Sequence, residues 1–257
     1  MTFTYISLFV LGTIFGSFLN AVVFRLKSSD SVLKGRSKCM SCDEVLHPKD
    51  LIPVVSYFLL KGRCRRCKNS IEKQYPVVEI LFGLLFVFLF AFHGSVFTSA
   101  SMSLFLRDAI FVSILAVLFI YDLRWMVLPD RVTLPAMAIA LILNLMAGVL
   151  PFWSLVVGAI VLAGFFYGQF AISGGTWVGG GDIRMGALMG FMLGIEYGLL
   201  ALFIAYVLGA IAGVALIVIK KVNRKTPIPF GTFLTLSTFI VLFYGKELLT
   251  WYFGLFA

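Results

Sequence analysis

Two aspartates lie where apolar, helix-forming stretches meet polar chain, and their side chains are the ones best suited to chemistry. Asp122 ends one apolar run, and Asp182 opens another 60 residues later. Two carboxylates held close together cannot both ionise cheaply, so they share a proton. One can then act as a base on water while the other, protonated, polarises a carbonyl group. Because the proton belongs to the pair, neither residue receives a fixed role.

Other readings compete for these acidic residues. Acidic side chains within a membrane are costly and usually functional, but an aspartate at the end of a span can also cap a helix or pair with an arginine. For Asp130, which follows a proline, the cap or ion pair is the stronger reading. Glu79 lies one turn inside an apolar helix, where we expect a supporting polar role. The available arginine partners are Arg124, Arg131 and Arg184.

Three glycines, Gly179, Gly180 and Gly181, directly precede Asp182. Glycines interrupt a helix and let the backbone approach an extended substrate closely. A helix that starts at Asp182 would also point the positive end of its dipole at this carboxylate. We therefore expect the glycines to bind substrate or to support the reactive aspartate.

All four cysteines fall in two C-x-x-C pairs, and 21 residues separate the pairs. The pairs are Cys39 with Cys42 and Cys64 with Cys67. This spacing is close to that of a four-thiolate zinc ribbon. Two disulfides or four unused thiols are the alternatives, and a reducing cytosol disfavours disulfides. Four cysteines close the coordination sphere, so we predict a structural zinc that folds the loop without catalysing a reaction.

The composition indicates that the helices carrying these residues span a membrane. Of the 257 residues, 61% are hydrophobic and 13% are charged, whereas soluble domains contain about 25% charged residues. A bilayer-spanning helix needs roughly 20 apolar residues, and the chain predicts an all-α, polytopic transmembrane bundle of about eight helices. The apolar runs lie near residues 4–24, 77–95, 105–122, 132–150, 152–172, 183–195, 197–219 and 229–256.

Basic residues give this bundle an orientation. With an outside N-terminus, the odd-numbered gaps between spans carry 19 of the 21 Lys and Arg residues. The seventh gap alone contributes Lys220, Lys221, Arg224 and Lys225. The positive-inside rule therefore places these gaps, the cysteine loop and both aspartates on the cytoplasmic side. The net charge of +9 is then a topology signal, and nucleic-acid binding is the weaker reading of it.

Several ordered motifs resemble the bacterial type IV prepilin peptidases, which are GxGD membrane aspartic proteases. The resemblance covers nearly the full chain. Its motifs are Gly16-Ser17-Phe18-Leu19-Asn20, the two C-x-x-C pairs, Gln74-Tyr75-Pro76-Val77-Val78-Glu79, Asp122 with Leu128-Pro129-Asp130, and Gly179-Gly180-Gly181-Asp182. Many members of the family have Lys two residues after the second aspartate, where this chain has Arg184, so the positive charge is retained.

The resemblance implies that Asp122 and Asp182 are the catalytic pair. It implies cleavage of a prepilin or pseudopilin leader after a Gly, followed by N-methylation with S-adenosylmethionine, in the bacterial inner membrane. The corresponding domains are a first transmembrane helix (1–26), a cytoplasmic zinc-binding loop (27–75) and a transmembrane peptidase domain of about seven helices (76–257). A transporter or channel with a zinc-ribbon regulatory loop, and a membrane methyltransferase without peptidase activity, are the competing functions.

Overall fold

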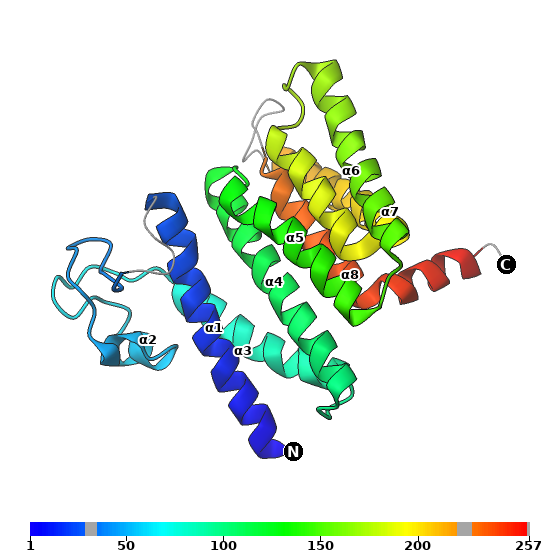
Figure 1. The fold of residues 1–257 in the computed structure, drawn as a ribbon. Helices are drawn as coiled ribbons and strands as arrows, with labels where there is room; N and C mark the ends of the chain where they lie inside the picture. Colours follow the sequence, from blue (N-terminus) through cyan, green and yellow to red (C-terminus); the bar gives the residue numbers. More distant parts are fainter. Residues whose placement is uncertain (29–34, 220–227, 256–257) are drawn as a thin grey trace. The chain divides into compact units, whose positions relative to one another are not determined.

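The computed structural model describes residues 1–28, 35–219 and 228–255, and within these ranges the regular elements are all helical (Figure 1). Among the described residues, seven helices are long and apolar enough to cross a membrane, which confirms the predicted all-α polytopic class. The elements are α1 (Thr2–Ser28), η1 (Pro48–Leu51), α2 (Val55–Leu59), α3 (Gln74–Phe92), α4 (Ser99–Trp125), α5 (Asp130–Ala147), α6 (Phe152–Ser173), α7 (Gly180–Val218) and α8 (Phe230–Gly254).

The chain forms two compact units, Met1–Ala109 and Ile110–Ala257. In the first unit, α1 and α3 approach closely because glycines face the neighbouring backbone. A Cβ added at Gly12 would lie 2.3 Å from the Phe82 carbonyl oxygen, and one at Gly16 would lie 2.8 Å from the Cα of Glu79. Small residues allow this kind of packing between membrane helices.

In the second unit, the first arm of α7 runs antiparallel to α6. Along the chain, Gly186 packs on Leu162, and Gly190 then packs on Ala159, which lies earlier in α6. The backbone leaves the helical region at Gly194 (φ 71°, ψ −172°). As a straight rod of 39 residues, α7 would be about 58 Å long, roughly twice the hydrocarbon thickness of a bilayer.

Beyond Gly194, α7 returns along α6 in the same direction as α6. Gly198 packs on Leu162 again, and the Tyr206 ring then contacts Phe165. Helix α7 is therefore a hairpin of two arms, and these arms correspond to the apolar runs predicted near 183–195 and 197–219. Counting the arms separately gives the predicted eight apolar helical segments among the described residues.

Two buried polar side chains complete the hydrogen bonds that the break at Gly194 interrupts. The Asn144 amide of α5 donates to the carbonyl oxygens of Phe191 (2.7 Å) and Met192 (3.0 Å). The N–H of Ile195 donates to the Ser154 hydroxyl of α6 at 3.2 Å. Irregular backbone at membrane depth is tolerated where protein groups satisfy it, so these two contacts allow the chain to reverse inside the bundle.

The hairpin brings several helix ends to one end of the second unit. Thr232 at the start of α8 contacts Asp122 at the end of α4, and Arg184 at the start of α7 contacts Asp130 at the start of α5. This arrangement agrees with the prediction that the third, fifth and seventh gaps share one face. The basic residues of the seventh gap, Lys220, Lys221, Arg224 and Lys225, lie outside the described residues.

Candidate active site and metal centre

Asp122 lies buried in the last turn of α4, where the N-terminus of α8 donates to its carboxylate. Its Oδ2 accepts hydrogen bonds from the Thr232 N–H (2.6 Å) and the Thr232 hydroxyl (3.0 Å). A helix N-terminus suits an anion because its first N–H groups have no partner within the helix. Gly231 permits the approach, since a Cβ there would lie 2.8 Å from the Asp122 carboxyl carbon.

Asp182 occupies the first turn of α7 and caps that helix. Its Oδ2 accepts a hydrogen bond from the Gly179 N–H at 2.9 Å, and Gly179 itself has extended backbone (φ −89°, ψ 164°). A Cβ at Gly180 would meet open space, whereas one at Gly181 would lie 3.2 Å from the Leu128 Cβ. Gly179 therefore presents extended backbone, and Gly180 an unobstructed helix start, directly beside the carboxylate.

The fold brings Asp122 and Asp182 close enough for their charges to interact. In each residue Oδ2 holds the local backbone, and no described residue donates a hydrogen bond to Oδ1. Among the described residues, no buried side-chain oxygen is left without a partner, so these Oδ1 atoms are accessible. Two carboxylates fixed through one oxygen and open at the other can bind and activate a water molecule.

The second arm of α7 adds Tyr206 to the surroundings of Asp182. The Tyr206 hydroxyl accepts a hydrogen bond from the Gln169 amide nitrogen at 2.8 Å, and its ring packs edge-on against Phe230 at 5.0 Å between centroids. Sequence reasoning missed Tyr206 and Thr232. Pro229 before an apolar run marked the start of a helix near Thr232. No local signal pointed to Tyr206, because only the reversal of α7 at Gly194 returns Tyr206 to the end of the helix hairpin where Asp182 lies.

Asp130 and Arg184 form an ion pair with each other, and both side chains are substantially exposed. The pair joins the start of α5 to the start of α7. This agrees with the reading of Asp130 as an arginine partner, one of the alternatives that the sequence left open. Exposed ion pairs contribute about 0–1 kcal/mol, so this contact helps to align the two helix ends but does not hold them together alone.

Glu79 belongs to the first unit, where it joins the cysteine loop to a membrane helix. The side chain is buried in α3, and its carboxylate accepts a hydrogen bond from the Val54 N–H at 2.6 Å. The backbone of α3 at Glu79 packs directly against Gly16 of α1. Val54 has φ 62°, a conformation that β-branched residues rarely adopt. The Glu79 contact therefore holds a strained turn of the loop against α1 and α3.

The four cysteines converge as the sequence predicted. Their sulfur atoms all lie within 4.8 Å of one another, and Sγ of Cys39 lies 3.8 Å from Sγ of Cys67. A tetrahedral site with Zn–S bonds of about 2.3 Å requires S–S edges of about 3.8 Å. The donor set and its spacing therefore fit one tetrahedral metal ion.

Each cysteine pair sits in the same kind of turn. The Cys39 N–H donates to the Glu44 carbonyl and the Cys64 N–H to the Asn69 carbonyl, each five residues on. Antiparallel bridges, Lys38 with Val45 and Arg63 with Ser70, close the two turns. The cysteine loop is thus two equivalent knuckles facing each other.

Backbone N–H groups lower the pKa values of these thiols, whereas burial and neighbouring sulfurs can raise them. The backbone N–H groups of Cys67 and Arg66 donate to the Cys64 sulfur and lower the pKa of its thiol to about 7. At Cys42 the Glu44 N–H has the same effect, yet burial and hydrogen bonds with Cys39 and Cys67 raise the pKa of that thiol to about 12. Four thiolates can coexist at neutral pH only with a cation between them.

The fold and the site define a multi-pass α-helical membrane protein with a paired-carboxylate site and a four-cysteine centre. Residues 10–93 match the bacterial Peptidase A24 N-terminal domain, and residues 109–214 match the type IV leader peptidase family. The chain belongs to the type IV leader peptidase family.

Similar proteins extend the match over almost the whole chain. The chain is 31% identical to the prepilin leader peptidase/N-methyltransferase of Aeromonas salmonicida (strain A449), covering 95% of this chain and 92% of the relative. It is 30% identical to the protein of the same name from Bacillus subtilis (strain 168), covering 95% and 96%. No solved structure matches the chain.

Proposed function

We propose that the protein is an intramembrane aspartic endopeptidase that removes the leader of type IV prepilins or pseudopilins. The observation that supports the proposal is that Asp122 and Asp182 lie close enough for their charges to interact, each held through Oδ2 and accessible at Oδ1. The names of the relatives, which cover both peptidase and methyltransferase activities, give the substrate class. The resemblance of the motifs gives cleavage after a Gly.

In the proposed reaction, the pair binds water and takes one of its protons as the oxygen attacks the scissile carbonyl. The resulting tetrahedral intermediate collapses when the C–N bond breaks and the amine leaving group takes up a proton from the pair. Neither aspartate has a fixed role as acid or base, because the proton is shared. Thr232 and Gly179 keep the two carboxylates oriented through this cycle.

The glycine run supplies a surface for the extended substrate. A scissile bond must leave helical geometry before its carbonyl can be attacked, and Gly179 has the extended backbone that could pair with such a segment. Gly180 and Gly181 have no side chain to obstruct it. The substrate's apolar helix would remain in the bilayer while its basic leader stays in water, which places the cut at the membrane boundary.

We propose the cytoplasmic boundary of the bacterial inner membrane as the location of this site. The helix ends that carry Asp122 and Asp182 share one face of the second unit, and the gaps assigned to that face hold seven of the eight Lys and Arg residues of this unit. The positive-inside rule then makes this face cytoplasmic. The cysteine loop, in a basic gap of its own, would lie in the same compartment.

We propose zinc as the ion that Cys39, Cys42, Cys64 and Cys67 hold. The S–S spacing suits zinc, and four thiolates leave no open position for substrate, so the metal would stabilise the loop. The reducing compartment proposed above would keep the thiols available.

N-methylation of the new N-terminus is proposed from the names of the relatives. S-adenosylmethionine would supply the methyl group, but its sulfonium is cationic. The pocket beside Cys64 is lined by Lys61, Arg63, Arg65 and Lys68, a charge that disfavours such a ligand. We therefore assign no residue of this chain to the methyl donor.

The test is cleavage of a prepilin by purified protein, followed by substrate mass. Asp122→Asn and Asp182→Asn should each reduce the rate by at least about a thousandfold while membrane insertion and thermal stability persist. Asp43→Asn, an exposed carboxylate of the cysteine loop, is the matched control and should retain activity. A fully active Asp122→Asn or Asp182→Asn variant would falsify the catalytic assignment.

The same measurement separates the competing functions. Leader loss indicates a peptidase, a methyl increment without leader loss indicates a methyltransferase alone, and an unchanged substrate favours transport. Transport is not favoured, because coupling ions usually bind near the bilayer midplane, whereas this carboxylate pair lies at helix ends.

A further inference from the structure

An uncharged apolar segment interrupts the otherwise basic cysteine loop. Residues 51–60 read Leu-Ile-Pro-Val-Val-Ser-Tyr-Phe-Leu-Leu, and this run lies between the two knuckles. Its large side chains do not form a core of their own, because Phe58 is 66% exposed and Leu59 75% exposed. Leu51, Ile52 and Val55 are exposed as well. A contiguous apolar patch of this kind on a polar loop marks a surface that contacts another apolar phase.

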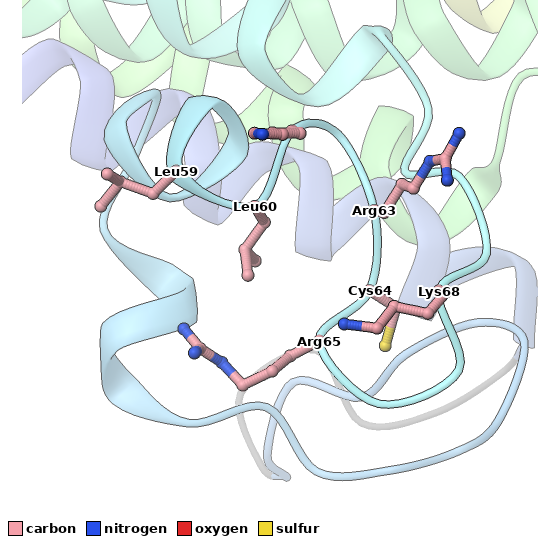
Figure 2. Close-up of a pocket in the computed structure, with 7 residues that line it drawn as sticks. Leu59, Leu60, Arg63, Cys64, Arg65 and Lys68 are labelled. Atoms are coloured by element: carbon pink, nitrogen blue, oxygen red, sulfur yellow. The ribbon is translucent and has the colours of Figure 1, made fainter.

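A pocket lined with basic residues adjoins this patch. The pocket has a volume of about 550 Å³ and is lined by Leu59, Leu60, Lys61, Arg63, Cys64, Arg65 and Lys68. In Figure 2, Leu60, Arg65 and Lys68 border one open space, and Arg63 points away from it. Arg65 is paired with Asp50 at 2.7 Å. Among the described residues, no carboxylate forms an ion pair with Lys61, Arg63 or Lys68.

The Glu79 contact places the apolar segment beside a membrane-spanning helix. Val54, in the middle of the segment, donates its N–H to the Glu79 carboxylate. Glu79 lies five residues beyond Gln74, the first residue of α3, and is thus about 7.5 Å along that helix. Interfacial helices bury their apolar face about 5–10 Å into the boundary between headgroups and acyl chains. With the start of α3 taken as the membrane boundary, the segment lies at the depth where its exposed side chains would meet lipid.

We propose that residues 51–60, together with Lys61, Arg63 and Lys68, form an interfacial docking surface for anionic phospholipids. Phe58 and Leu59 enter the upper acyl region, Lys61 and Lys68 contact lipid phosphates at the pocket, and Arg63, which points away from the pocket (Figure 2), contacts phosphates beside it. Apolar side chains beside a cluster of basic residues have the composition of such anchors. The charge also argues against the substrate as occupant, because the leader expected here is itself basic. The docking would hold the metal-binding knuckles against the bilayer.

The first experiment uses tryptophan as a depth probe in the full chain, reconstituted in nanodiscs. Phe58→Trp is compared with Met40→Trp, which replaces a side chain of matched exposure (68%) in the first knuckle, outside the apolar segment. Lipids brominated near the top of the acyl chain should quench the Phe58→Trp variant more than wild type, and the Met40→Trp variant less. If the Phe58→Trp variant shows no quenching beyond wild type, or the two variants are quenched equally, the docking is wrong.

The second experiment tests the charge. In the Phe58→Trp background, quenching should rise about twofold when roughly a third of the lipid is anionic. Lys61→Gln/Arg63→Gln/Lys68→Gln should abolish this increase, whereas the control Lys38→Gln/Lys49→Gln, outside the pocket, should preserve it. Equal zinc content in all variants establishes that the loop is folded. The proposal is overturned if the triple variant and its control respond alike, or if another copy of the chain shields the probe in both lipid mixtures.

Discussion

The cysteine centre and the carboxylate pair each join two distant parts of the chain, but different forces assemble them. In the cysteine centre, each half is a short turn closed by its own backbone hydrogen bonds, and the four sulfurs face one another. In the carboxylate site, Asp122 and Asp182 sit at the ends of long helices, and each is held by a different helix terminus. In the cysteine centre all four donor atoms face the space between the knuckles, whereas the carboxylate site leaves one oxygen of each carboxylate accessible.

This difference gives the two sites different roles: the cysteine centre stabilises the loop, and the carboxylate site is suited to chemistry. A site whose donors all face a common centre is complete once a metal binds, so it can only fold the loop around it. A site whose carboxylates are held by helix N-termini keeps their remaining oxygens available for reaction. Its geometry, however, depends on the packing of the helices that carry these groups. The two sites should therefore fail in different ways when the chain is altered.

Removing the metal should give the largest effect, and it should be confined to the cysteine loop. Structural zinc contributes about 10–16 kcal/mol of apparent binding free energy in isolated zinc peptides, so chelation or Cys64→Ser should unfold the knuckles. Limited proteolysis and zinc content would measure this in the full chain. Ser41→Ala, between the ligands of the first knuckle, should change neither quantity. A Cys64→Ser variant with full zinc and unchanged protease resistance would contradict the four-cysteine site.

A methyl group inserted between α6 and α7 should disturb the carboxylate site while leaving the cysteine loop folded. A Cβ at Gly190 would lie 2.1 Å from the Ala159 nitrogen, and backbone cannot move aside as a flexible side chain would. Gly190→Ala should cost about 1–3 kcal/mol and lower both the melting temperature and the cleavage rate, with zinc content unchanged.

Gly164→Ala provides the matched control for that substitution, because an added Cβ there meets nothing within 4 Å. Thermal unfolding in detergent should show no loss of stability for it. Equal melting temperatures for the two variants would mean that the close approach of α6 and α7 does not contribute to the fold.

The smallest effect should come from removing one of the two hydrogen bonds that Thr232 donates to Asp122. Thr232→Val keeps the backbone N–H but loses the hydroxyl donor, so kcat/KM for cleavage should fall about tenfold and its pH profile should shift. Thr232→Ser should restore both. Thr238→Val removes a buried hydroxyl that bonds only within α8, and it should leave the pH profile unchanged. If Thr238→Val shifted the pH profile as much as Thr232→Val does, the effect of Thr232 would be structural and not a direct effect on Asp122.

Much of the fold could be predicted from the sequence because its signals are local. Apolar runs of membrane length predict spanning helices. The cysteine spacing predicts two knuckles that face each other, and the structure brings the four sulfurs together in this way. The number of apolar segments was predictable as well. Their connection was not, because the two runs that meet at Gly194 form one hairpin whose turn depends on Asn144 and Ser154 from other helices.

The amino-acid sequence by itself determined the membrane class and predicted that the four cysteines converge, because these follow from composition and short spacings. Its motifs also single out Asp122 and Asp182 as the proposed catalytic pair. Only the tertiary structure decided which oxygen of Asp122 is held by Thr232, that Tyr206 returns to the neighbourhood of Asp182, and that Asp130 pairs with Arg184. The physical reason is that these contacts join segments more than 20 residues apart. Helix packing, which no local pattern encodes, sets their geometry.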